Sequence, residues 1–302
     1  MLSLPRVKTP RSGFWALFLV YFIWGSSFLA IRLAVSGAGS FQPYSLAAIR
    51  TLSAGLLLLA WAGVRGDSLR IGWTRFRWLA LTGILLWVGG HTLVIWAERR
   101  MESGLAALLF ASTPLWAAML EGLRGRGFRA APVIAGFVGV TLVLPPATLG
   151  PGLWVDAAVL LISAFFWAFG TVLGEGPAAG LPIPVATGIQ LTVAGLVTSL
   201  LAYEAGESAP APDLRAFLAC AYLIFFGTVL AYLAYSHALR TLPVAWLMSF
   251  GYVNPVVAVA LGALVLGERV EARSALGISV VVGSVIWLFA GSAPQKAARG
   301  VT

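Results

Sequence analysis

Two stretches of the sequence decide the fold: ALLFASTPLWAAM at residues 107–119 and MSFGYVNPVVAVA at residues 248–260. Each is a long apolar run with one proline near its middle, Pro114 in the first and Pro255 in the second. A proline deletes one helical hydrogen bond and kinks the helix that contains it. Because the two prolines lie 141 positions apart, the runs look like equivalent parts of a repeated unit.

The composition around these runs is that of a membrane protein. Of the 302 residues, 60% are hydrophobic and only 10% are charged, whereas soluble domains carry about 25% charged residues. A compact soluble globule could not bury that much apolar surface in one core. The single cysteine, Cys220, excludes an intrachain disulfide.

Ten apolar segments are long enough to span a bilayer, which requires about 20 residues. Strands are excluded because the runs are long and lack period-2 alternation. A cleaved signal peptide is the alternative for the first segment, but its length and its counterpart in the second half favour a mature helix. The expected spans are 13–35, 42–64, 74–96, 103–123, 129–148, 152–174, 182–203, 213–236, 242–266 and 272–291.

The distribution of Lys and Arg predicts the orientation of the chain. Thirteen of the 20 basic residues fall on the side that carries both termini, and five fall on the other side. Since cytoplasmic loops are enriched in Lys and Arg, we expect an inner-membrane protein with cytoplasmic tails at 1–12 and 292–302. The net charge of +9 thus reflects membrane orientation rather than nucleic-acid binding.

The two prolines define a repeat of five helices, over residues 13–148 and 152–291. Because five is odd, the second half must enter the membrane in the opposite sense. An inverted repeat with matched interrupted helices is typical of secondary transporters that bind substrate in a central cavity. At or near the proline offset, several residues align between the halves: Arg99 with Arg240, Thr113 with Asn254, His91 with Tyr232, and Trp24 with Trp167.

Several motifs resemble the EamA family of the drug/metabolite transporter superfamily. They are YFIWGSSFLAIRLA (21–34), Arg50, LLFASTPLWAAML (108–120), VNPVVAVALGALVLGERV (253–270) and ALGISVVVGSVIWL (275–288). The resemblance implies ten helices and a transporter. The density of aromatic residues is also similar to that of bacterial YddG-type aromatic amino-acid exporters, which implies export of amino acids and related metabolites. The chain departs from the regular pattern where GRGF (125–128) stands opposite LGER (266–269), and where Gln190 stands opposite Arg50.

Polar and aromatic residues within the spans are the candidate cavity lining. His91 is ionisable within a span, which makes it a functional candidate, and it shares a helix face with Trp87. It could titrate to couple transport to protons, or it could simply bond a neighbouring helix. Its repeat counterpart Tyr232 has Thr228 and Tyr235 beside it.

The interrupted helices and the deeper tryptophans supply further candidates. Trp24, Trp167 and Trp246 could form an aromatic wall. Polar side chains beside a disrupted backbone are tolerated in a membrane if they line a cavity, which selects Thr113 and Asn254. Pro114 and Pro255 are the expected hinges. The turn before Asn254 adds three candidates: Met248, Ser249 and Tyr252.

Charged residues in the spans have simpler interpretations. Arg50 could neutralise a substrate carboxylate, but we expect it to hold its helix in place by binding carbonyl groups. Glu98, Asp156 and Glu175 lie near predicted helix ends, where interfacial or gating contacts are expected.

The sequence therefore predicts an all-α integral membrane protein that exports amino acids, including aromatic or neutral ones, by alternating access. A cationic drug exporter, an importer or another metabolite carrier, a membrane scaffold and an intramembrane enzyme are the alternatives. Without a P-loop, a metal-ligand group or a recognisable triad, we expect no enzyme activity and no cofactor. The expected partners are a small-molecule substrate and the lipid bilayer but not nucleic acid, with the chain a monomer or homodimer.

Overall fold

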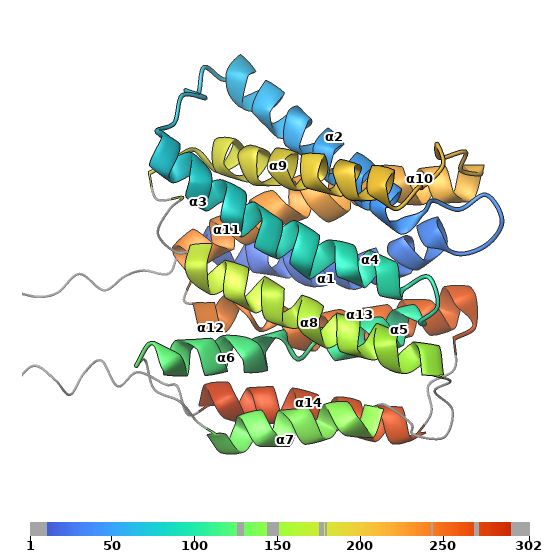
Figure 1. Ribbon diagram of the computed structural model, residues 1–302. Coiled ribbons are helices and arrows are strands. Elements are labelled where there is room, and N and C mark those ends of the chain that lie inside the picture. The colour runs from blue at the N-terminus through green and yellow to red at the C-terminus, as the bar shows by residue number, and fades with distance from the viewer. Residues whose placement is uncertain are drawn as a thin grey trace, which may run out of the picture.

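The computed structural model describes residues 11–125, 130–143, 151–174, 178, 180–242, 244–268 and 272–290. Within these ranges every regular element is helical, and the helices lie side by side as a bundle (Figure 1). The predicted tails fall outside the described residues, apart from Arg11 and Ser12. The elements of the first half are α1 (Arg11–Val35), α2 (Pro43–Val64), α3 (Trp73–Gly83), π-helical η1 (Ile84–Thr92), α4 (Leu93–Ala97), α5 (Ser103–Phe110), α6 (Thr113–Leu123) and α7 (Ala130–Val143).

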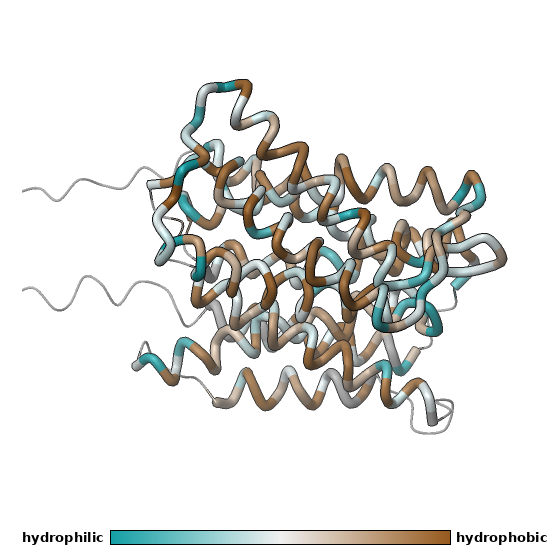
Figure 2. The backbone as a smooth tube through the Cα atoms, turned by 45° about the horizontal axis from the view of Figure 1, so that its top comes forward, coloured by the Kyte–Doolittle hydropathy of each residue, from teal (hydrophilic) through white to brown (hydrophobic). Residues whose placement is uncertain are grey.

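The second half repeats this order of elements, with one additional π-helical segment, η3. It comprises α8 (Pro151–Gly174), α9 (Ile183–Glu204), α10 (Leu214–Tyr222), π-helical η2 (Leu223–Leu230), α11 (Ala231–Thr241), α12 (Val244–Leu247), α13 (Phe250–Leu261), π-helical η3 (Gly262–Leu266) and α14 (Ala272–Ala290). Each of the ten predicted spans contains helix. Among the described residues, seven continuous helices are long and apolar enough to cross a membrane, and three apolar helices are shorter: Ala130–Gly139, Val253–Leu266 and Ala275–Ser284. Most hydrophilic segments gather at the two ends of the bundle, as Figure 2 shows.

The two halves pack against each other reciprocally. Helix α2 packs along its counterpart α9, and α7 packs along its counterpart α14. Helix α1 contacts α11 and α13 of the second half, while α8 contacts η1, α4, α5 and α6 of the first. Small residues allow this approach: a Cβ atom on Gly195 of α9 would lie 2.7 Å from the Leu52 Cα atom of α2.

Both proline-containing spans are interrupted, but not in the same way. The first breaks at Ala111–Ser112, directly before Pro114, which is in the first turn of α6. In the second span, Pro255 lies inside the continuous helix α13, and the break comes earlier, at Met248–Ser249. Thus Pro114 marks the break that was expected, whereas Pro255 does not lie at its break.

Hydroxyl side chains compensate for the hydrogen bonds lost at the two breaks. Ser112 Oγ donates to the Leu109 carbonyl at 2.8 Å, and Thr113 Oγ1 donates to the Phe110 carbonyl at 2.6 Å. Ser249 Oγ donates in the same way to Trp246. Because lipid offers no hydrogen-bond partners, these side chains allow the backbone to bend within the bundle.

The third span of each half contains a π-helical segment, η1 in the first and η2 in the second. In each segment a threonine hydroxyl bonds the carbonyl five residues earlier: Thr92 to Trp87 at 2.9 Å and Thr228 to Leu223 at 2.8 Å. Such π-helical turns occur frequently at functional sites. They bring the central residues of the candidate site together.

Candidate functional site

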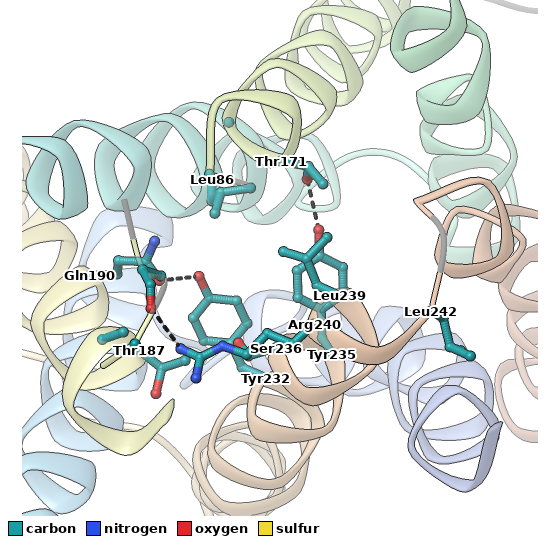
Figure 3. Close-up of a pocket in the computed structure, with 15 residues that line it drawn as sticks. Leu86, Thr171, Thr187, Gln190, Tyr232, Tyr235, Ser236, Leu239, Arg240 and Leu242 are labelled. Atoms are coloured by element: carbon teal, nitrogen blue, oxygen red, sulfur yellow. Dashed lines mark hydrogen bonds between the residues drawn. The ribbon is translucent and has the colours of Figure 1, made fainter. Parts of the chain in front are cut away.

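A cavity of about 530 Å³ enters the bundle from the end where α8 and α11 finish and α9 begins. Figure 3 shows its side chains, which come from η1, α8, α9 and α11. Most of its polar side chains are uncharged: Thr171, Thr187, Gln190, Tyr232, Tyr235 and Ser236. Arg240 is the one charged residue among the described lining residues, and it donates hydrogen bonds to the carbonyls of Leu181 and Ala178 at 2.7 and 3.2 Å.

Hydrogen bonds between helices fix the inner wall of this cavity. The Tyr232 hydroxyl donates to Gln190 Oε1 at 2.6 Å, and Gln190 Nε2 donates to Thr82 Oγ1 at 2.8 Å. The hydroxyls of Tyr235 and Thr171 lie 2.7 Å apart (Figure 3). Because Tyr232, Gln190, Tyr235 and Thr171 are each held by a partner on another helix, this part of the wall is preorganised to present hydroxyl and amide groups to a substrate.

Behind the two tyrosines lies a layer of aromatic rings from both halves. Trp24 and Trp167 meet edge to face at a centroid distance of 5.2 Å, and Trp24 lies 5.0 Å from Tyr235. Trp87 lies 5.0 Å from Tyr232 and 5.8 Å from Trp167. All five residues are buried. Edge-to-face contacts of this kind add to the energy of burial, so the layer forms a firm partition across the bundle.

Arg50 binds the second half next to this layer. Its side chain is completely buried, Nε donates to Thr228 Oγ1 at 2.6 Å, and Nη2 donates to the Gly227 carbonyl at 3.1 Å. The same carbonyl accepts a hydrogen bond from Trp24 Nε1 at 3.1 Å. The guanidinium group therefore joins α2 to η2, which agrees with a role in holding its helix rather than in lining the cavity.

His91 contacts this guanidinium group through Nε2, which lies within hydrogen-bonding distance of Arg50 Nη1. A guanidinium group only donates hydrogen bonds, so Nε2 must accept and the imidazole proton must reside on Nδ1. A neutral histidine beside a buried cation is a poor proton carrier in this conformation. The arrangement favours the alternative of a histidine bonded to a neighbouring helix.

At the end of the bundle opposite the cavity, the closed end, Glu98 and Met101 are buried and Glu268 binds another span. Glu268 accepts hydrogen bonds from the backbone N–H groups of Ser103 and Gly104 at 3.0 and 3.2 Å, at the beginning of α5. Gly267, with φ of +68°, turns the chain so that Glu268 can reach this position. Anions stabilise a helix N-terminus, so the LGER motif ties η3 to α5.

The structure sorts the predicted cavity residues into three groups. Tyr232 and Tyr235 line the cavity, and the second group forms the buried partition with Arg50 behind them: Trp24, Trp87, Trp167, Thr228 and His91. The third group lies on or beside the interrupted helices: Thr113, Met248, Ser249, Asn254 and Trp246. In that group the structure does not bring Trp246 inward, because its side chain is 57% exposed and packs on Phe14. The side chain of Tyr252 lies outside the described parts of the chain.

Several cavity residues are not among the candidates that the sequence predicts. Thr187 and Gln190 lie three positions apart in α9, and Thr171 lies in α8. Polar residues spaced by one helical turn within an apolar span carry the necessary signal. The sequence marks Gln190 only as the counterpart of Arg50, because no sequence pattern reveals that it bonds Tyr232.

Sequence comparison identifies the family to which this bundle belongs. The profile of the EamA-like transporter family matches the chain twice, over residues 11–144 and 155–290. The chain belongs to the EamA-like transporter family. The predicted family and all-helical fold of repeats are thereby confirmed, and this EamA-like protein is a membrane transporter.

Individual relatives agree with the family assignment. The uncharacterized inner membrane transporter YedA of Escherichia coli K12 is 36% identical over 282 residues, which cover 90% of this chain and 89% of YedA. Protein PecM of Dickeya dadantii is 28% identical over 280 residues, which cover 87% and 88% of the two chains. A solved crystal structure shares the fold with a TM-score of 0.69 at 20% identity, covering 93% of this EamA-like chain and 98% of the other.

Proposed function

We propose that this protein is an inner-membrane secondary carrier that exports amino acids, aromatic and neutral ones among them, and related metabolites by alternating access. The observation that carries the proposal is a cavity of about 530 Å³ that opens at one end of the bundle and ends at a partition of buried aromatic rings. Ligand sites of this kind combine apolar and aromatic walls with a few placed polar groups.

The chemistry of the lining supports a zwitterionic substrate. Hydroxyl and amide groups of Thr187, Gln190 and Ser236 offer acceptors for an ammonium group, and the two tyrosine rings offer surface for an apolar side chain. Arg240 supplies positive charge at the side that would receive a carboxylate. No carboxylate belongs to the described lining residues, which disfavours the cationic drug exporter.

The orientation proposed from the Lys and Arg distribution sets the direction in which the cavity faces. With both termini in the cytoplasm, the open end faces the cytoplasm. This is the side from which an exporter collects its substrate. The closed end would then face the periplasm.

Uptake by purified protein in liposomes tests the proposal. Labelled amino acids and one quaternary cation are supplied with and without an imposed pH gradient. We expect saturable amino-acid uptake that falls at least tenfold in Gln190→Leu but is unchanged in Leu196→Ala, a lipid-facing control on the same helix. Uptake of the cation without uptake of any amino acid would overturn the amino-acid assignment.

A further inference from the structure

A buried carboxyl group at the closed end has no part in the cavity described above. Glu98 directly follows α4, and its residue exposure is 0%. Neither side-chain oxygen has a hydrogen-bond partner anywhere in the described ranges. Arg32 comes close, but its Nη1 donates to the backbone carbonyl of Glu98 at 2.5 Å rather than to the carboxyl group.

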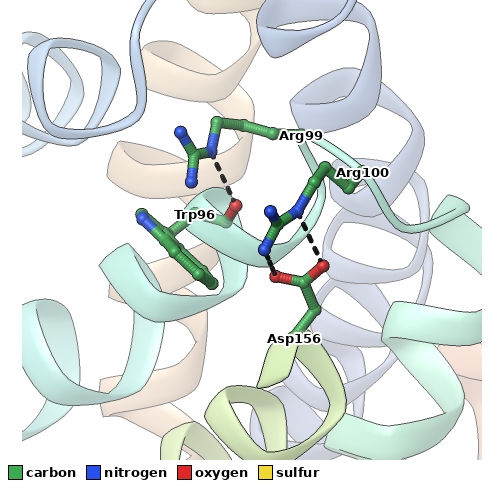
Figure 4. Close-up of polar contacts among 4 residues, drawn as sticks. All are labelled: Trp96, Arg99, Arg100 and Asp156. Atoms are coloured by element: carbon green, nitrogen blue, oxygen red, sulfur yellow. Dashed lines mark hydrogen bonds and ion pairs between the residues drawn. The ribbon is translucent and has the colours of Figure 1, made fainter. Parts of the chain in front are cut away.

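The other charged groups near Glu98 are already engaged or repel it. Helix α4 packs against α1, α2, η1 and α8. Figure 4 shows that Arg100 binds Asp156 of α8 through two hydrogen bonds, of 2.7 and 3.0 Å, while Arg99 bonds the Trp96 carbonyl. The charged groups that act on Glu98 from these elements and from the segment after η3 are Arg32, Arg50 and Glu268. Of the other titratable groups on the packed elements, His91 binds Arg50 and Asp156 binds Arg100.

The protonation state of Glu98 follows from this environment. Burial raises the pKa of the Glu98 carboxyl well above its usual range, the positive charges of Arg32 and Arg50 oppose the shift, and the negative charge of Glu268 adds to it. An ionised carboxylate removed from water without hydrogen-bond donors is strongly disfavoured. The group therefore carries its proton while this end of the bundle is closed.

We propose that Glu98 is a proton-binding site that holds the end of the transporter opposite the cavity in its closed form. The proposal deepens the alternating-access function and rests on it. When this end opens, water reaches the carboxyl group, which then loses its proton to water as an ordinary glutamic acid does, with a pKa of about 4.3. Closing requires the proton to return. Lower pH therefore favours the closed form, and higher pH favours the open form.

The position of Glu98 makes it suited to this role. It lies between α1 and the loop to α5, at the same end where Glu268 holds the N-terminus of α5. An ionised Glu98 could not remain in its present place, since Arg32 is engaged with a backbone carbonyl and Arg50 with Thr228 and Gly227. Deprotonation would thus separate the helices that meet here.

A cysteine reporter measures opening of this end. Met101 is 1% exposed in the closed form, so Met101→Cys is placed in a Cys220→Ala background, in nanodiscs that leave both faces accessible. The rate of labelling by a polar maleimide is followed from pH 5 to pH 9. We expect the rate in protein with Glu98 to rise relative to Glu98→Gln by up to about tenfold per pH unit between the pKa of an exposed glutamic acid, about 4.3, and the higher pKa of the closed form, and to level off above the latter.

Two controls separate the effect of Glu98 from the chemistry of the thiol. Dividing the labelling rate of the protein with Glu98 by that of Glu98→Gln cancels the pH dependence of thiol ionisation. The second control, Glu204→Gln, removes an exposed carboxylate at the same end of the bundle. Its labelling rate should show the same pH dependence as that of the parent protein. Equal pH dependence with and without Glu98 would overturn the proposal.

An infrared spectrum provides a second measurement that does not depend on opening. We expect the carbonyl band of a protonated, buried carboxylic acid at neutral pH, and expect it to be lost in Glu98→Gln. An unchanged band would also refute the assignment. Neither experiment uses a transported substrate, so failure of the amino-acid assay leaves the Glu98 test intact.

Discussion

At the scale of single residues, Arg50 shows how a charge is accommodated in a membrane bundle. Its guanidinium group is completely buried and reaches Thr228, Gly227 and His91 at once. Lysine keeps the charge but cannot form this planar set of hydrogen bonds. Arg50 therefore stabilises the bundle through the directions of its hydrogen bonds as well as through its charge.

Replacing Arg50 by lysine tests this interpretation. We expect Arg50→Lys to lower the free energy of unfolding by about 1.5–3 kcal/mol, the typical value of a hydrogen bond to a charged group. Thermal unfolding in detergent, followed by loss of the monodisperse size-exclusion peak, measures the change. Arg215→Lys, at an exposed position, is the matched control, and an equal melting temperature for all three proteins would contradict the prediction.

At the scale of elements, the two interrupted helices are related but not equivalent. A break directly precedes Pro114, whereas α13 continues through Pro255 and its break lies at Met248–Ser249. A Cβ atom on Gly251 would lie 2.9 Å from Pro114 Cγ, so the two helices cross next to both breaks. Bending at these breaks would change the packing of the two halves together.

Hydrogen exchange distinguishes the roles of the two prolines. Pro114→Ala supplies the missing N–H group beside a break, so we expect exchange across residues 107–119 to slow several-fold. Pro255→Ala should leave exchange at 244–250 nearly unchanged, because that break does not depend on the proline. Equal effects on both breaks would show that Pro255 acts as a hinge after all.

At the scale of the whole molecule, the cavity and the closed end lie on opposite sides of the aromatic partition. Only one side of the membrane should therefore reach the cavity residue Ser236. In a Cys220→Ala background, we expect Ser236→Cys to react with a membrane-impermeant thiol reagent in inside-out vesicles and not in right-side-out ones. A lipid-facing Leu196→Cys, which is 58% exposed in the bundle, should resist labelling in both, and labelling of residue 236 from the outside would refute the proposed orientation.

The sequence by itself determined the fold class, because apolar runs of about 20 residues in a chain with 10% charge have few stable arrangements other than spanning helices. It also indicated the repeat, through the paired prolines, and the central aromatic residues Trp24, Trp87 and Trp167. These signals are local, since they depend on spacing and residue type within one helix.

Only the tertiary structure decided which residues line the cavity, which form the partition and which close the other end. The sequence predicts His91 as a cavity residue, but in the structure it lies against Arg50. Conversely, the structure places Gln190 in the cavity wall, where it accepts a hydrogen bond from Tyr232. Glu98 looked like an ordinary helix end and is buried without a donor among the described residues. Burial and hydrogen bonds between helices depend on neighbours more than 40 positions away in the chain. The periodicity within a single helix therefore does not predict these contacts.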